Sequence, residues 1–191
     1  PEYEETLDIW DEQMIQYGSQ VIQFRQEFIE QLNNIILGIH KQLSGEEETL
    51  ELFYEANTSI DQLKNSLAKS RESDLRQKTT GVGPHRDDIS FMVNGIDIRK
   101  FGSQGQQRTA ALSLKLAEIE LVKHLVNDYP ILLLDDVLSE LDGNRQKHLL
   151  SGINHIQTMI TCTGLEDFLN HRFPINKVYR VVKGTVISDD S

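Results

Sequence analysis

One long run of regularly spaced apolar residues constrains the fold more than any other feature of this sequence. Between residues 4 and 44, apolar side chains recur at alternating steps of three and four, the spacing of one face of an α-helix. A helix this long with an apolar face needs an apolar partner, and Ser44-Gly45 marks its end. The positions are Leu7, Trp10, Met14, Tyr17, Val21, Phe24, Phe28, Leu32, Ile35, Ile39 and Leu43.

The segments that follow predict a partner for this helix. Residues 49–54 fit either a short strand or a further helical turn. Thr58 is a candidate N-cap for a second helix, with Ile60, Leu63 and Leu67 on one side. Two helices packed antiparallel would bury both apolar faces. We therefore expect residues 1–78 to form a helical arm domain.

From residue 79 the pattern becomes that of an α/β unit. After a loop at 80–84, residues 89–93 alternate, Asn94-Gly95 predicts a type I′ turn, and 96–98 return as the second strand. A helix is predicted over 109–126. The apolar run 131–134 fits a strand buried on both faces, as in a parallel sheet. A helix at 146–153, a strand at 158–162 and a hairpin at 178–187 complete this predicted domain, 79–191.

Composition excludes several classes of protein. No apolar run approaches the roughly 20 residues of a membrane span, and no signal peptide opens the sequence. Cys162 is the only cysteine, which rules out an internal disulfide, argues against structural zinc and fits a reducing cytoplasm. The first residue is Pro1, which suggests a fragment of a longer protein.

The net charge of −11 is unevenly spread. Residues 1–78 hold 16 acidic and 7 basic side chains, whereas residues 79–191 hold 14 and 12. An acidic surface repels a phosphate backbone, so any DNA-binding surface is expected outside the first 78 residues. The simplest interpretation of the acidic segment is a solvated helix face.

The residues with the clearest chemical signal are Asp135 and Asp136, which follow the apolar run 131–134. Ligands of open α/β sheets bind at this carboxyl edge. Because side chains alternate along a strand, one carboxylate can hold Mg²⁺ while the other orients an attacking water. An isolated pair of this kind is more often a strand that ends in two solvated acids.

Two further motifs accompany this acid pair. Ser103-Gln104-Gly105-Gln106-Gln107 directly precedes the helix predicted at 109–126, and a hydroxyl with free N–H groups at a helix start suits a phosphate. Taken alone, it is equally an ordinary loop with an N-cap. Asp142 stands seven residues after Asp135, within Ser139-Glu140-Leu141-Asp142.

In this order the motifs resemble the signature, Walker B strand and D-loop of ABC and SMC ATPase heads. Gly83-Pro84-His85-Arg86-Asp87-Asp88, followed by the serine motif and Arg108, resembles the RecF family of recombination mediators specifically. The resemblance covers essentially the whole chain. It implies an α/β fold: the carboxy-terminal part of a P-loop ATPase head with an all-helical arm.

The resemblance assigns roles position by position. Asp135 matches the Walker B carboxylate that supports Mg²⁺. Asp136 matches the position of the catalytic carboxylate, which is Glu in most ABC proteins. The shorter side chain of Asp implies slow hydrolysis. Ser103 and Gly105 match signature residues on the γ-phosphate, within a cofactor-binding loop that also holds Gln104, Gln106 and Gln107. Asp142 matches the D-loop residue at a dimer seam. His85 and Arg86 have no assigned role; a turn with a buried Arg–Asp pair and a substrate contact both remain open.

Two departures qualify these assignments. The sequence holds no Gly-x-x-x-x-Gly-Lys-Ser/Thr loop, so we expect this chain alone to be inactive as an ATPase. The switch histidine that often follows the next strand has no match, because Met159-Ile160-Thr161-Cys162-Thr163 offers only hydroxyls and a thiol.

By resemblance, the intact protein would be a slow ATPase with ATP and Mg²⁺ as cofactors and an ATP-dependent homodimer. It would bind single/double-strand DNA junctions, mainly outside this chain, and aid recombinase loading with RecR and RecO in gap repair, replication restart and the SOS response. The rival interpretations are a non-catalytic interaction module whose arm binds a protein partner, and the head of another SMC-like ATPase.

Overall fold

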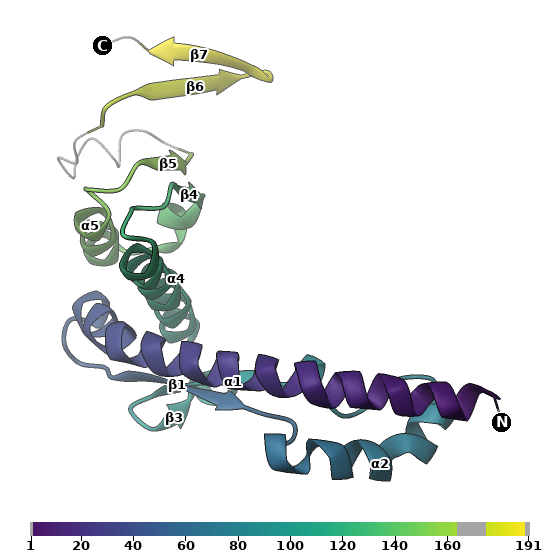
Figure 1. Cartoon of the computed structure of the whole chain (residues 1–191). Coiled ribbons are helices and arrows are strands. Elements are labelled where there is room, and N and C mark those ends of the chain that lie inside the picture. The colour runs from purple at the N-terminus through teal and green to yellow at the C-terminus, as the bar shows by residue number, and fades with distance from the viewer. Residues whose placement is uncertain (1, 164–174, 190–191) are drawn as a thin grey trace. The chain divides into compact units, whose positions relative to one another are not determined.

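The computed structural model describes residues 2–163 and 175–189 (Figure 1). Their contacts divide the chain into two compact units, Pro1–Asn127 and Asp128–Ser191. This division does not coincide with the boundary expected near residue 78. It lies later because a strand from the first 78 residues pairs with a strand that follows them.

The first unit is a three-stranded antiparallel sheet surrounded by helices. Strand β1 pairs with β2, with Leu50 opposite Val93 and Glu55 opposite Asp88, and β2 pairs with β3. The elements are α1 (Glu2–Ser44), β1 (Leu50–Glu55), α2 (Ile60–Gln77), the 3-10 turn η1 (Pro84–Arg86), β2 (Asp88–Val93), β3 (Ile96–Asp97), α3 (Ile98–Phe101) and α4 (Gln104–Val126).

This sheet tests two expectations that came from local sequence patterns. Residues 49–54, which fitted a strand or a helical turn, contain β1, so the first 78 residues are helical apart from this strand. The turn between β2 and β3 has φ of 48° at Asn94 and 80° at Gly95. Both angles are positive, as a type I′ turn requires, which confirms the predicted hairpin.

The core of this unit lies where the second half of α1 meets the sheet and α4. Strand β1 turns alternate side chains inward, so that Leu50 and Leu52 are buried. They pack with Leu32 and Ile36 of α1 and with small side chains of α4 such as Ala117. The contact of α1 with α4 therefore joins segments about 70 residues apart in sequence, as Figure 1 shows.

The first half of α1 packs against α2, and the two helices are antiparallel as predicted. Leu63 and Leu67 of α2 form a small core with Ile22. Toward the other end of α2, Arg71 forms ion pairs with Asp8 at 2.6 Å and Asp11 at 2.5 Å.

The predicted apolar stripe of α1 is only partly buried. Trp10, Tyr17 and Phe24 are exposed, whereas Ile22 and Ile29, outside the predicted stripe, are buried. The prediction was wrong at these positions because the helix is apolar on two adjacent sides. Within the described residues, α2, β1 and α4 cover the side that carries Ile22, Ile29 and Leu32.

The second unit contains a parallel strand pair and a separate hairpin. Strand β4 (Leu132–Asp135) pairs in parallel with β5 (Thr158–Thr161). Between them lie the 3-10 turn η2 (Val137–Glu140) and helix α5 (Gly143–Gly152), the crossover that parallel strands need. Strands β6 (Val178–Val182) and β7 (Thr185–Asp189) form the predicted hairpin.

Burial of β4 on both faces, expected from its apolar run, is not observed. Leu134 is buried, but Leu133 is 68% exposed and Met159 of β5 is 64% exposed. Alternation along a strand sends Leu133 and Leu134 to opposite faces. Among the described residues, only the face of Leu134 is covered.

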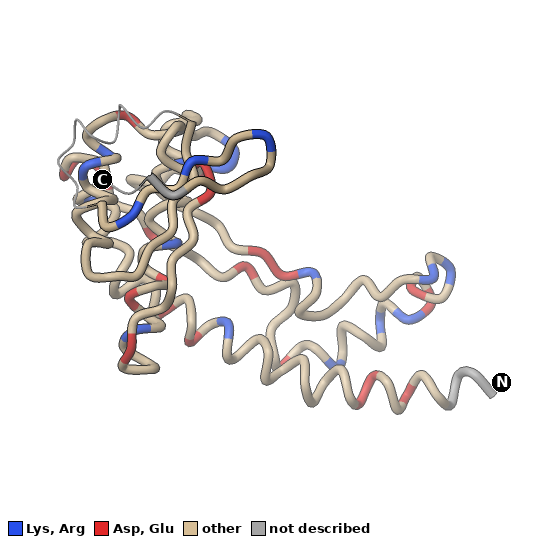
Figure 2. The backbone as a smooth tube through the Cα atoms, turned by 90° about the horizontal axis from the view of Figure 1, so that it is seen from above, with Lys and Arg blue, Asp and Glu red and all other residues tan. Residues whose placement is uncertain are grey.

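Lys and Arg are interspersed with Asp and Glu along the described chain, as the coloured backbone in Figure 2 shows. None of the described helices combines the length and the apolar character that crossing a bilayer would require.

Candidate functional site

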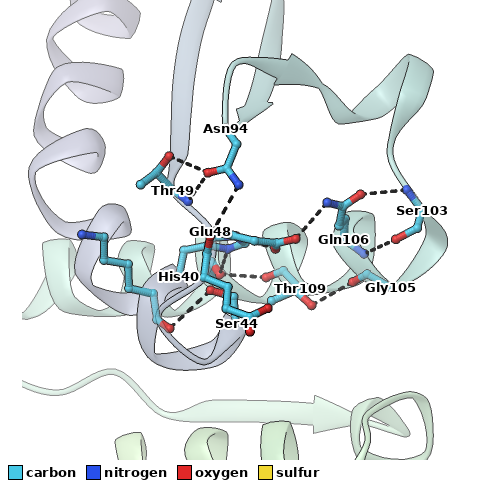
Figure 3. Close-up of polar contacts among 12 residues, drawn as sticks. His40, Ser44, Glu48, Thr49, Asn94, Ser103, Gly105, Gln106 and Thr109 are labelled. Atoms are coloured by element: carbon cyan, nitrogen blue, oxygen red, sulfur yellow. Dashed lines mark hydrogen bonds and ion pairs between the residues drawn. The ribbon is translucent and has the colours of Figure 1, made fainter.

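Ser103 caps the start of α4, where the sequence predicted an anion site. Its side-chain oxygen accepts a hydrogen bond from the Gln106 N–H at 3.2 Å, and Gln106 Oε1 accepts one from the Ser103 N–H at 3.0 Å. This reciprocal pair is a capping box (Figure 3). The N–H groups of Gln104 and Gly105 then lie ahead of the helical hydrogen-bond ladder, at the positive end of a 23-residue helix.

The neighbours of this cap hold its backbone in place. The Gln107 side chain donates to the Ile98 carbonyl at 2.8 Å. A Cβ on Gly102 would lie 2.6 Å from the same carbonyl, so only glycine fits there. Gly102 directly precedes the serine motif, and its packing role was not predicted. A loop fixed this way presents its hydroxyl and N–H groups with little freedom, which suits recognition of an anionic group.

Asp135 and Asp136 lie at the carboxyl end of β4, as predicted, and both are exposed. The Thr161 hydroxyl, at the end of the paired strand β5, donates to Asp135 Oδ1 at 2.5 Å. The Thr161 hydroxyl oxygen accepts from the Asp136 N–H at 3.1 Å, and the Thr161 carbonyl accepts from that N–H at 3.2 Å. Thr161 therefore holds both acids in one arrangement.

The two carboxylates are directed differently by the backbone. Asp135 is the last residue of β4, whereas Asp136 has φ of 52° and precedes η2. The left-handed conformation of Asp136 is one that aspartate and asparagine tolerate better than most residues. This break in the strand separates the two acids, which agrees with the expectation of different roles.

The donor set at this edge fits magnesium. Hard carboxylate and hydroxyl oxygens are the ligands that Mg²⁺ prefers, and it usually keeps waters and substrate phosphates in its shell. Among the described residues, no three His, Cys, Asp or Glu side chains gather as a metal cluster. One carboxylate beside a bound phosphate matches this pattern better than an all-protein cage would.

Asp142 caps helix α5, a role that the sequence did not predict. Its carboxylate accepts hydrogen bonds from the N–H groups of Asn144 at 3.1 Å and Arg145 at 3.0 Å. The Arg145 guanidinium lies 3.1 Å from the other oxygen. A structural role is thus established for Asp142, and its D-loop role stays a prediction.

Replacing Asp142 by alanine is expected to lower the free energy of unfolding by about 0.5–2 kcal/mol, because two N–H groups at the start of α5 lose their acceptor. Asp142→Ser, which keeps a capping oxygen, is the matched variant and should lose much less. Chemical denaturation measures both. Equal stability of the two variants would contradict a capping role.

Asp87 forms an Arg–Asp pair, one of two possibilities for the His85-Arg86 motif, but its partner is Arg25, whose side chain is 46% exposed. The Asp87 side chain is 1% exposed and lies 3.6 Å from the Arg25 guanidinium. It also accepts hydrogen bonds from the Tyr54 hydroxyl and from the Asn57 N–H. Arg86 instead donates to the carbonyl of Thr80, within its own loop.

This environment gives a pH-dependent prediction for Tyr54. Desolvation and the hydrogen bond to Asp87, partly offset by Arg25, raise the pKa of Tyr54 to about 12. The folded state therefore holds the Tyr54 proton more tightly than the unfolded chain, in which tyrosine has a pKa of about 10. The resulting stabilisation is complete below the unfolded pKa and is lost as the pH rises toward the folded pKa. Ultraviolet titration should show one tyrosine that ionises at higher pH than the others, and Asp87→Asn should lower the pKa of that tyrosine. An unchanged titration would contradict the assignment to Tyr54.

The structure thus brings Asp135, Asp136 and Thr161 together, with Asp142 at the start of the following helix. Ser103 through Gln107 belong to the first unit, and the acids belong to the second. Thr161 was noted in the sequence only as a poor substitute for a histidine. Its hydrogen bond to Asp135 depends on the register of β4 with β5, which no local pattern reveals.

Comparison with known proteins identifies close relatives, although no family model matches the chain. It is 57% identical over 182 residues to the DNA replication and repair protein RecF of Lachnoclostridium phytofermentans, a match that covers 95% of this chain and 51% of the relative. The RecF of Lachnospira eligens is 52% identical, with 97% and 51% covered. A solved structure of the recombination mediator protein RecF with ATP has a TM-score of 0.81 at 36% identity and covers 97% of this chain. The chain spans about half the length of these relatives.

Proposed function

Since this chain belongs to the RecF family, we propose that it supplies the signature, Walker B and D-loop elements of an ATP-dependent DNA repair protein. In this proposal the full-length protein binds ATP with Mg²⁺ and dimerises on it. The Ser103 loop of one subunit faces the nucleotide held by the other. Such a two-fold arrangement would enclose two nucleotides.

The observation that carries the proposal is the Ser103 cap at the start of α4. The capping box satisfies the Gln106 N–H, and the N–H groups of Gln104 and Gly105 precede the helical ladder. A phosphate placed there would accept hydrogen bonds from those groups and would meet the positive end of the helix. The solved RecF structure that carries ATP supports nucleotide as the ligand.

The acid pair is proposed to act on the nucleotide of its own subunit. When Mg²⁺ is bound it neutralises phosphate charge, and Asp135, oriented by Thr161, would hold it. Asp136 would accept a proton from the attacking water, the role of a general base. Its side chain is one methylene shorter than the glutamate usual in this position, which would make turnover slow.

The proposal also covers the substrates and partners of the full-length protein. The solved structures are described as a recombination mediator in the RecFOR pathway. We propose that the full-length protein binds junctions between single- and double-stranded DNA and acts with RecR and RecO in gap repair. The chain has a net charge of −11, so the DNA contact would lie mainly outside it.

A second candidate function is a non-catalytic interaction module. The exposed side chains of Trp10, Tyr17 and Phe24 on α1 favour it, since they offer apolar area for a partner. Equilibrium dialysis of labelled ATP against the full-length protein separates the two candidates. Only the nucleotide-dependent function requires saturable binding.

The proposal is tested by sedimentation of the full-length protein with and without ATP. Ser103→Arg should abolish ATP-induced dimers, because the long cation replaces the capping oxygen and fills the phosphate position. Ser151→Arg, a change at an exposed serine of α5, is the matched control and should dimerise normally. Dimers that persist unchanged in Ser103→Arg would overturn the proposed role of the loop.

A further inference from the structure

A series of polar side chains in contact with one another connects the end of α1 with the start of α4. His40 is fully buried, its Nδ1 lies 2.9 Å from the Ser113 hydroxyl of α4, and its Nε2 lies 3.4 Å from Glu48 Oε2. The other oxygen of Glu48 accepts a hydrogen bond from Gln106 Nε2 at 2.8 Å. Figure 3 shows Glu48 between His40 and Gln106, with Ser103 on the far side of Gln106.

Hydrogen-bond counting fixes which atom donates between His40 and Ser113. The Ser113 hydroxyl donates its one hydrogen to the Thr109 carbonyl at 2.7 Å. Its oxygen must therefore accept from His40, so that Nδ1 carries a hydrogen. His40 Nε2 then faces Glu48 Oε2, and a proton on either of these two atoms would join them in a hydrogen bond.

Two hydrogen bonds set the orientation of the Gln106 amide. The Ser103 N–H can only donate, so it meets the Gln106 carbonyl, and the amide NH₂ then points to Glu48 Oε1. The opposite orientation would place an NH₂ against an N–H. The backbone beside Glu48 is also held, because the Asn94 side chain accepts from the Thr49 N–H at 2.9 Å.

We propose that Glu48, held by His40, is a positioning residue for the Ser103 loop. It keeps Gln106 in the orientation that closes the capping box and so presents the Ser103 hydroxyl and the first-turn N–H groups to the phosphate. The effect on nucleotide rests on the proposed function, whereas the effect on the cap does not. A change at the end of α1 would reach the loop through the same contacts.

The direct test is hydrogen exchange at the Ser103 amide in the full-length protein. In Glu48→Gln this amide should exchange about tenfold faster, because the hydrogen bond that fixes Gln106 loses its charged acceptor. Glu51→Gln, the same chemical change at an exposed position of β1, is the matched control and should exchange like the original protein. Equal exchange in all three proteins would overturn the proposal whether or not ATP binds.

An exchanged pair distinguishes positioning from a general loss of structure. Gln106→Glu alone sets two carboxylates against each other and should weaken ATP-induced dimerisation about tenfold. Glu48→Gln with Gln106→Glu restores an amide–carboxylate pair and should recover most of that loss. Absence of recovery would overturn the pairing. If the unaltered protein does not dimerise with ATP, the proposed function fails, and the exchange result still decides the role of Glu48.

Discussion

Replacing Asp136 by asparagine in the full-length protein is expected to slow ATP turnover by about 10²- to 10⁴-fold, the usual contribution of a general base. ATP-induced dimers should persist or live longer, because the amide still fits beside the nucleotide but accepts no proton from water. Asparagine also tolerates the left-handed backbone at this position, so the local fold should survive. Steady-state phosphate release and sedimentation with ATP measure the two effects.

The control for this experiment is Asp128→Asn in the same unit. Asp128 is exposed, and its carboxylate accepts a hydrogen bond from the neighbouring Tyr129 N–H at 2.8 Å, which asparagine can keep. Turnover in this variant should match that of the unaltered protein. Unchanged turnover in Asp136→Asn would remove Asp136 from the catalytic role.

Truncation of Leu32 to alanine is expected to lower the free energy of unfolding by about 2–5 kcal/mol. Leu32 is fully buried on α1, in the cluster that joins this helix to β1 and α4. Loss of its side chain removes apolar contacts and leaves a cavity that surrounding close-packed groups fill only partly. Denaturant unfolding monitored by circular dichroism measures the change.

Leu75→Ala on α2 provides the comparison for this truncation. Leu75 is 51% exposed, so the same change in composition removes little buried area. Its effect should stay within about 0.5 kcal/mol, as for most surface substitutions. A similar loss at Leu75 and Leu32 would contradict the placement of the core between α1, β1 and α4.

Local patterns in the sequence predicted the elements well where the chemistry is local. The Asn94-Gly95 turn, the parallel crossover between β4 and β5 and the cap at Ser103 each depend on residues close together in the chain. The acid pair at the end of β4 was predicted for the same reason. An apolar run of strand length that ends in charged residues has few alternatives in an α/β fold.

The structural features that the sequence did not predict depend on contacts between segments that are distant in the chain. The choice between the two apolar sides of α1 is decided by α2, β1 and α4, and periodicity alone does not rank Phe24 against Ile22. The contact of His40 with Ser113 joins residues 73 positions apart. A buried histidine beside a glutamate leaves no local signature, so this support for the Ser103 loop emerged only from the structure.

The central claim, that Ser103 of one subunit completes the nucleotide site of another, is tested most directly by mixing two inactive proteins. One carries Ser103→Arg, and the other carries an inactivating change in the phosphate-binding loop that the family resemblance places outside this chain. Each alone should lack turnover, since every site that it could form with a copy of itself has one defective half. The account predicts that the mixture regains ATP turnover, because mixed dimers hold one site with two intact halves. If mixed dimers form but the mixture stays inactive, the phosphate-binding loop and the Ser103 signature act within one subunit. That result would contradict a nucleotide site shared between subunits.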